Sequence, residues 1–62
     1  MDSINRTIVR ARRFLRLGNG RAYEDEMIQC IRESNVEDVE YLIKAGKRDG
    51  YSFRQFGLKV KV

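Results

Sequence analysis

Apolar side chains recur at helical spacing through most of this chain, and that spacing constrains the fold more than any other feature. The first stripe has the 4-3-4 spacing that places four side chains on one face of a helix: Ile4, Ile8, Ala11 and Leu15. Phe14 flanks this stripe, Ser3 suits an N-cap, and Gly18 suits a left-handed helix end. The pattern predicts a helix over residues 3–17.

Two further helices are expected, over residues 21–33 and about 36–46. The first would bury Tyr23, Met27, Cys30 and Ile31, with Ile28 at the margin and acidic residues 24–26 near its N-terminus. The second would bury Val36, Val39, Leu42 and Ile43. Ser34 and Glu37 have the spacing of a capping box, which predicts that one helix ends and the next begins there. Gly46 or Gly50 would end the third helix.

Beyond Gly50 the period changes from that of a helix to that of a strand. Leu58, Val60 and Val62 alternate with lysines, and Tyr51 and Phe53 also lie two positions apart. This spacing predicts a short β segment or hairpin over residues 51–62. Since an isolated hairpin is only marginally stable, its aromatic rings would have to lie on the helices. The alternative is a lone edge strand that pairs with a second chain. The expected fold class is mostly α with minor β, as a single domain over residues 1–62.

The length of 62 residues implies marginal stability, since a chain of this size buries only about 60% of its unfolded surface. Such chains often need an oligomer or a larger partner to be stable. Cys30 is the single cysteine and there is no histidine, so neither an internal disulfide nor a zinc site is expected. The sequence has no apolar run long enough to span a bilayer and does not begin like a signal peptide, which favours a reducing, cytoplasmic location.

Charge is divided into three blocks along the chain. Residues 1–21 carry six arginines against Asp2, for a net +5. Residues 22–46 have seven acids and two bases, for −5, and residues 47–62 have five bases and Asp49, for +4. An acidic middle folded beside a basic first helix can neutralise part of it. The arginines are therefore not automatically a ligand site.

The residues needed for catalysis are scarce. Cys30 lies on an apolar helix face, where a cysteine is usually a small core residue. The acidic residues 24–26 are consecutive and so point in three directions on a helix, and the Gly-Asn-Gly-Arg segment at residues 18–21 matches no phosphate-binding loop. We expect no enzymatic activity, no cofactor and no metal site.

The leading hypothesis is a small interaction protein, a regulator, inhibitor or adaptor, that docks on the acidic surface of a larger protein. It would use a basic amphipathic first helix, with the C-terminal strand as a second candidate contact, either by strand addition to the partner or by forming a homo-oligomer. The candidate binding residues are Arg6, Arg10, Arg13, Arg16, Arg21, Lys59 and Lys61.

Two alternatives stay open. One is sequence-nonspecific nucleic-acid binding by the same basic residues, with base stacking on Tyr51, Phe53 and Phe56 if these rings are exposed. The other is a self-contained domain, favoured if Arg6, Arg10 and Arg13 pair with acids of residues 24–40. A helix-turn-helix DNA reader is not favoured, because acidic residues 37, 38 and 40 would begin its recognition helix.

Overall fold

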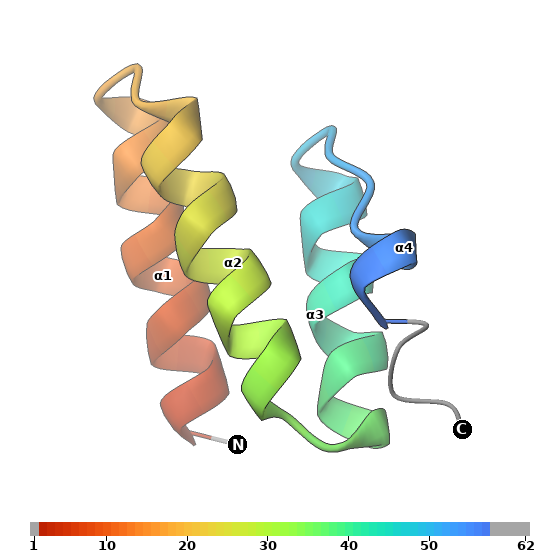
Figure 1. Cartoon of the computed structure of the whole chain (residues 1–62). Helices are drawn as coiled ribbons and strands as arrows, with labels where there is room; N and C mark the ends of the chain where they lie inside the picture. Colours follow the sequence, from red (N-terminus) through yellow and green to blue (C-terminus); the bar gives the residue numbers. More distant parts are fainter. Residues whose placement is uncertain (1, 58–62) are drawn as a thin grey trace.

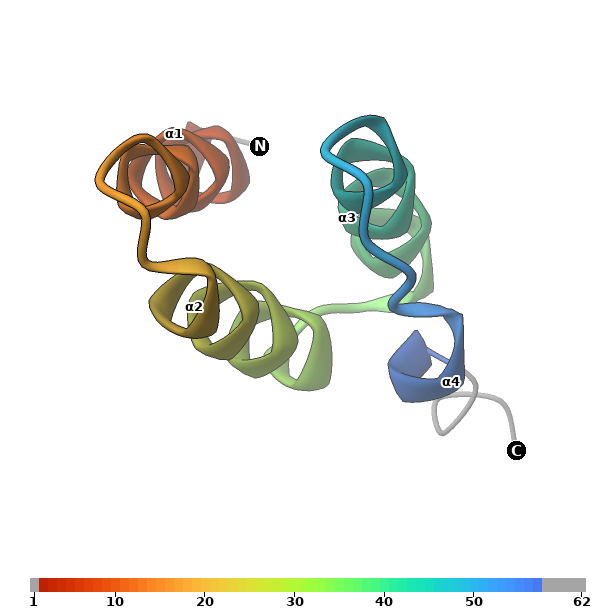
Figure 2. The same ribbon diagram turned by 90° about the horizontal axis from the view of Figure 1, so that it is seen from above.

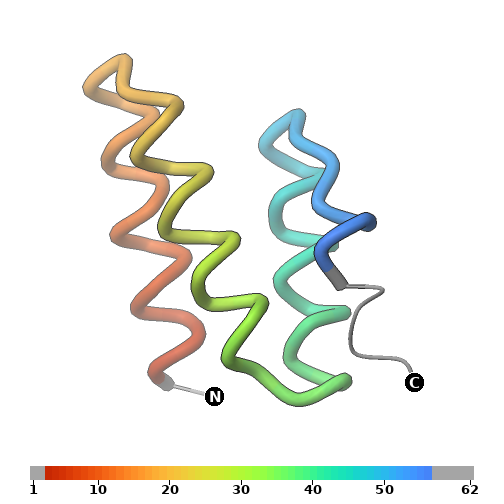
Figure 3. Tube along the Cα trace, viewed as in Figure 1, coloured from red at the N-terminus to blue at the C-terminus, as the bar shows by residue number. Residues whose placement is uncertain are grey.

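Residues 2–57 are described by the computed structural model, and within them the chain forms four helices and no strand (Figure 1). The helices are α1 (Asp2–Arg16), α2 (Gly20–Glu33), α3 (Val36–Arg48) and the short α4 (Arg54–Gly57). The backbone runs along α1, returns along α2 and runs forward again along α3, so α1 and α3 are roughly parallel (Figure 3). The prediction of three main helices is confirmed.

The turn between α1 and α2 is a glycine stop followed by an asparagine cap. Gly18 has a φ of +79°, as predicted for the residue that ends the first helix. The side chain of Asn19 then accepts a hydrogen bond from the backbone N–H of Ala22 at 3.1 Å, so α2 begins at Gly20. The N-cap prediction for Ser3 is wrong, because α1 begins at Asp2 and Ser3 lies inside it.

The junction between α2 and α3 differs from the predicted capping box by one residue. Ser34 ends α2, and its hydroxyl donates back to the carbonyl of Cys30 at 2.6 Å. Asn35 caps α3 instead, accepting from the N–H of Asp38 at 2.9 Å. The acids of α2 lie beyond its first turn, whereas Glu37 and Asp38 occupy the first turn of α3.

The core is a single apolar cluster to which every main helix contributes. Its buried members are Ile4, Ile8, Ala11, Tyr23, Met27, Ile31, Val39, Leu42, Ala45 and Phe53. Phe14, Leu15, Cys30 and Ile43 are partly buried against it. The prediction that Val36 is buried is wrong: at the first position of α3 it is 54% exposed.

The segment after α3 is not a strand. Residues 51–53 are irregular and Arg54–Gly57 is helical, which contradicts the first half of the predicted hairpin. The predicted strand at residues 58–62 lies outside the described residues. Phe53 is 2% exposed and its ring lies so close to Gly46 that a Cβ there would meet it at 2.5 Å. The aromatic spacing therefore reflects an extended segment laid across α2 and α3, held by ring packing instead of by a β ladder.

Candidate functional site

The outward side of α1 carries the predicted arginines. Four of them form what we call the basic face of α1, and all four are exposed: Arg6, Arg10, Arg13 and Arg16. Arg21 is also exposed, near the start of α2. Lys59 and Lys61, the remaining candidates, lie outside the described residues.

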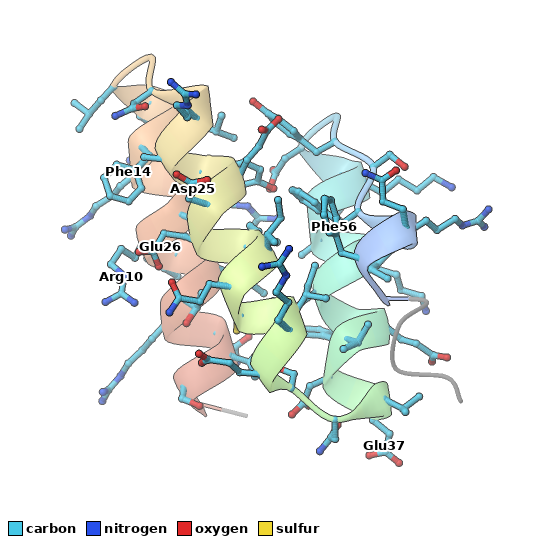
Figure 4. All side chains as sticks on the ribbon, viewed as in Figure 1. Arg10, Phe14, Asp25, Glu26, Glu37 and Phe56 are labelled. Atoms are coloured by element: carbon cyan, nitrogen blue, oxygen red, sulfur yellow. The ribbon has the colours of Figure 1, made fainter. Side chains whose placement is uncertain are left out.

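Within residues 3–56, whose side chains the structure describes, two arginines form ion pairs with acids of the same chain. Arg10 reaches Glu26 of α2 at 3.3 Å, and the two side chains lie together beside the α1–α2 contact (Figure 4). Arg12 pairs with Asp49, which follows α3. A self-contained domain was predicted to pair Arg6, Arg10 and Arg13 with residues 24–40. Of these three arginines, Arg10 forms such an ion pair within the described residues, with Glu26.

Asp49 is the centre of a polar network at the edge of the core. The Nε of Arg12 donates to both of its carboxylate oxygens, at 3.1 and 3.0 Å, and the hydroxyl of Tyr23 donates to Oδ2 at 2.7 Å. Arg12 also donates to the carbonyl of Ala45 at 3.5 Å. Since the Asp49 side chain is only 15% exposed, these donors replace water that it has lost. The network ties α1, α2 and the end of α3 together.

The environment of Tyr23 raises the pKa of its phenol well above the usual value near 10. Burial is the main cause, followed by the hydrogen bond to Asp49 and the negative charge of that carboxylate, while Arg12 opposes the shift. Tyr23 therefore stays protonated and acts as a hydrogen-bond donor. This hydrogen bond therefore links α2 to the residue that follows α3.

Two large apolar side chains lie uncovered among the arginines. Val9 is 60% exposed and Leu17, directly after α1, is 79% exposed. A shallow depression of about 370 Å³ surrounds Val9, with Arg6, Arg10 and Arg13 at its sides. The outward surface of α1 is therefore a mixed surface, with apolar side chains between positive charges.

A deeper groove lies between α1 and α3. Both helices pack beside α2, and their direct contact is less extensive than that of α1 with α2 (Figure 2). The groove has a volume of about 600 Å³. Its basic lining residues are Arg12 from α1 and Lys44, Lys47 and Arg48 from α3.

The sequence did not single out the α3 bases of this groove as binding residues. Lys44 and Arg48 are four positions apart and so share a helix face, which is a signal that the sequence does contain. That they lie opposite Val9 follows from the parallel course of α1 and α3, which no local pattern indicates.

The three C-terminal aromatic residues do not form an open stacking platform. Phe53 is buried, and Tyr51 and Phe56 are partly buried. The rings pack on one another and on the core: Tyr51 stacks on Phe53 at 5.9 Å and lies 4.6 Å from Tyr23 between ring centroids. The exposure that would have favoured base stacking is not found.

Among residues 2–57 there is no group of three or more metal-ligating side chains. In the same part of the chain, every helix is too short or too polar to span a membrane.

Comparison with protein-family models, with curated proteins and with solved structures found no match. The features that bear on function are therefore those of the surface of this chain.

Proposed function

We propose that this chain is a small non-enzymatic interaction protein, a regulator, inhibitor or adaptor, that docks on an acidic surface of a larger protein through the basic face of α1. Arg6, Arg13 and Arg16 would supply charge complementarity and a fast association rate. The single cysteine suits a reducing compartment, and we propose the cytoplasm as its location.

The observation that supports this proposal is the exposure of Val9 and Leu17 in the same outward sector as the arginines. A helix that only had to stay solvated would not need a valine and a leucine there. Interfaces combine desolvated apolar contacts, which supply most of the affinity, with a charged rim that sets orientation and association rate. The outward side of α1 has both components.

The test is affinity capture from host extract at physiological salt after nuclease treatment. We expect the full chain to retain a protein partner, and Arg13→Glu combined with Arg16→Glu to lose it. Arg32→Glu combined with Arg54→Glu is the control of equal charge change, because these two exposed arginines lie on α2 and α4 and are not candidate binding residues. The proposal would be contradicted if the two double variants retained the partner protein equally. It would also be contradicted if a capture without nuclease treatment recovered nucleic acid and no protein.

The alternative is sequence-nonspecific nucleic-acid binding, favoured by the five arginines among the candidate residues, all of which are exposed. It predicts retention on DNA or RNA at low salt, with an affinity that falls log-linearly as salt increases. Each arginine removed from a phosphate contact would reduce the magnitude of the slope of log affinity against log salt concentration by roughly one. Absence of retention at low salt would eliminate this alternative.

A further inference from the structure

The groove between α1 and α3 has an apolar surface. Ile8 and Ala45 are buried at its base, and Val9 and Tyr41 line it with exposed fractions of 60% and 43%. The hydroxyl of Tyr41 donates to Asn5 across the groove at 3.0 Å, which holds α3 against α1 at this point. Apolar surface thus lies exposed on both facing helices.

The charge of the groove has one sign. Among the described residues that line it, Arg12, Lys44, Lys47 and Arg48 are basic and none is acidic. Arg12 is already neutralised by Asp49. Among residues 3–56, whose side chains the structure describes, the three α3 bases form no ion pair, so their charge remains available to an acidic ligand.

Topology reinforces this charge. Because α1 and α3 are roughly parallel, their C-terminal ends lie at the same end of the molecule, which brings Arg13 and Arg16 of α1 to the end that holds Lys47 and Arg48 of α3. Glu37 lies at the opposite end (Figure 4). The groove therefore leads away from the acidic start of α3 toward a basic end.

We propose that this groove binds an amphipathic helix of the partner protein, with its apolar side chains on Val9 and Tyr41 and its carboxylates beside Lys44 and Arg48. This inference rests on the proposed function and specifies the chemistry of the partner. Helices bind such grooves through apolar residues at positions i, i+3, i+4 and i+7. A volume of about 600 Å³ is within the usual range for a site that accepts a few large side chains.

Two other occupants fit the groove less well. A nucleic-acid backbone would satisfy the lysines but leave Val9 and Tyr41 uncovered, because phosphates and sugars have no comparable apolar face. The chain's own residues 58–62 carry Lys59 and Lys61, whose charge has the same sign as the groove.

The test uses a fluorescein-labelled peptide of about 14 residues, with leucines at the four helical positions and glutamates elsewhere, so that one face matches the groove. Binding to the full-length chain is measured by fluorescence anisotropy at physiological salt. A scrambled peptide of the same composition and a DNA duplex of about 12 base pairs serve as comparison ligands. We expect the amphipathic peptide to bind at least about tenfold more tightly than either.

Variants locate the site. Val9→Asp and Arg48→Glu should each weaken peptide binding about tenfold. Val36→Asp and Arg32→Glu are the matched controls, since Val36 is 54% exposed and neither residue lines the groove, and they should change affinity less than about twofold. Circular dichroism checks that every variant is folded.

Several outcomes would overturn the inference. These are no peptide binding at millimolar concentration, equal binding of the scrambled peptide, tighter binding of the duplex, or equal effects of the groove and control variants. If the captured partner depends on Arg13 and Arg16 but is unaffected by Val9→Asp and Arg48→Glu, the proposed function stands and the groove is not its site. If no protein partner is captured while the peptide binds as expected, the groove assignment stands and the docking role of the α1 arginines fails.

Discussion

At the scale of single residues, Asp49 is the side chain on which most of the polar contacts at the core edge converge. Counted along the sequence, it is one acid in a basic block. In the fold it accepts from both Arg12 and Tyr23, residues 37 and 26 positions away. A carboxylate that is 15% exposed needs such donors, because a largely buried charge without partners is strongly destabilising.

Replacing Tyr23 by Phe tests this network through its pH dependence. At neutral pH the variant should be less stable by about 1.5–3 kcal/mol, the usual value of a hydrogen bond to a charged group. The folded state raises the pKa of Tyr23, so above about pH 10 the unfolded chain binds fewer protons than the folded one. The contribution of Tyr23 to the free energy of unfolding is therefore fully present below pH 10. It decreases as the pH rises above 10, by at most about 1.4 kcal/mol per pH unit.

The measurement is urea unfolding of parent and variant between pH 7 and 11, in which the stability gap should narrow above pH 10. Tyr41→Phe is the matched control, since this ring is 43% exposed and its hydroxyl donates to Asn5 at the surface. A gap that stays constant to pH 11 would show that the Tyr23 phenol is not the group responsible.

At the scale of helices and turns, the sequence predicted the buried stripes well because helical periodicity is a local property. The stripes at Ile4, Ile8 and Ala11 and at Tyr23, Met27 and Ile31 are all buried. The ends were harder to predict. Ser34 and Asn35 are adjacent and both can cap a helix, so the sequence alone does not decide between them.

The structure of residues 51–57 was mispredicted for a different reason. Tyr51 and Phe53 lie two residues apart, which is the spacing of a strand and equally of an irregular extended segment. What decides between them is the space at Gly46, which accepts the ring of Phe53. That space is created by tertiary packing between α3 and the following segment, and the sequence does not show it.

Gly46→Ala separates helix propensity from packing. By propensity alone, alanine at this position near the end of α3 should stabilise the protein by up to about 1 kcal/mol. The added Cβ would instead meet two carbons of the Phe53 ring at 2.5 Å, which forces the ring to move. We expect the variant to be less stable by about 1–3 kcal/mol in chemical denaturation.

A double-mutant cycle with Phe53→Leu is the control for this prediction. If the clash with the ring is the cause, Gly46→Ala should destabilise the Phe53→Leu protein less than it destabilises the parent, by at least about 0.5 kcal/mol. Additive effects, or a stabilising Gly46→Ala in the parent, would contradict the packing argument.

At the scale of the whole molecule, the exposed arginines of the candidate site could be predicted because a wide single-sign sector cannot be buried in so small a core. The groove could not, since it depends on where α1 lies relative to α3. The same placement separates Arg12, which Asp49 neutralises, from Arg13, the next residue, which points outward. Neighbours in sequence therefore have different roles, one structural and one open to a partner.

The stability of the molecule as a unit is expected to be small. A single core in a chain of 62 residues rarely supplies more than about 3–5 kcal/mol, and truncating a buried phenylalanine to alanine removes about the same amount. Phe53 is 2% exposed and covers Tyr23 and Gly46, so Phe53→Ala should leave the chain largely unfolded at 25 °C. Far-ultraviolet circular dichroism with urea titration measures this, and Val36→Ala at an exposed apolar position should remain within about 0.5 kcal/mol of the parent. If Phe53→Ala retained a cooperative transition near that of the parent, the segment after α3 would not be part of the core, and α1, α2 and α3 would have to be stable without it.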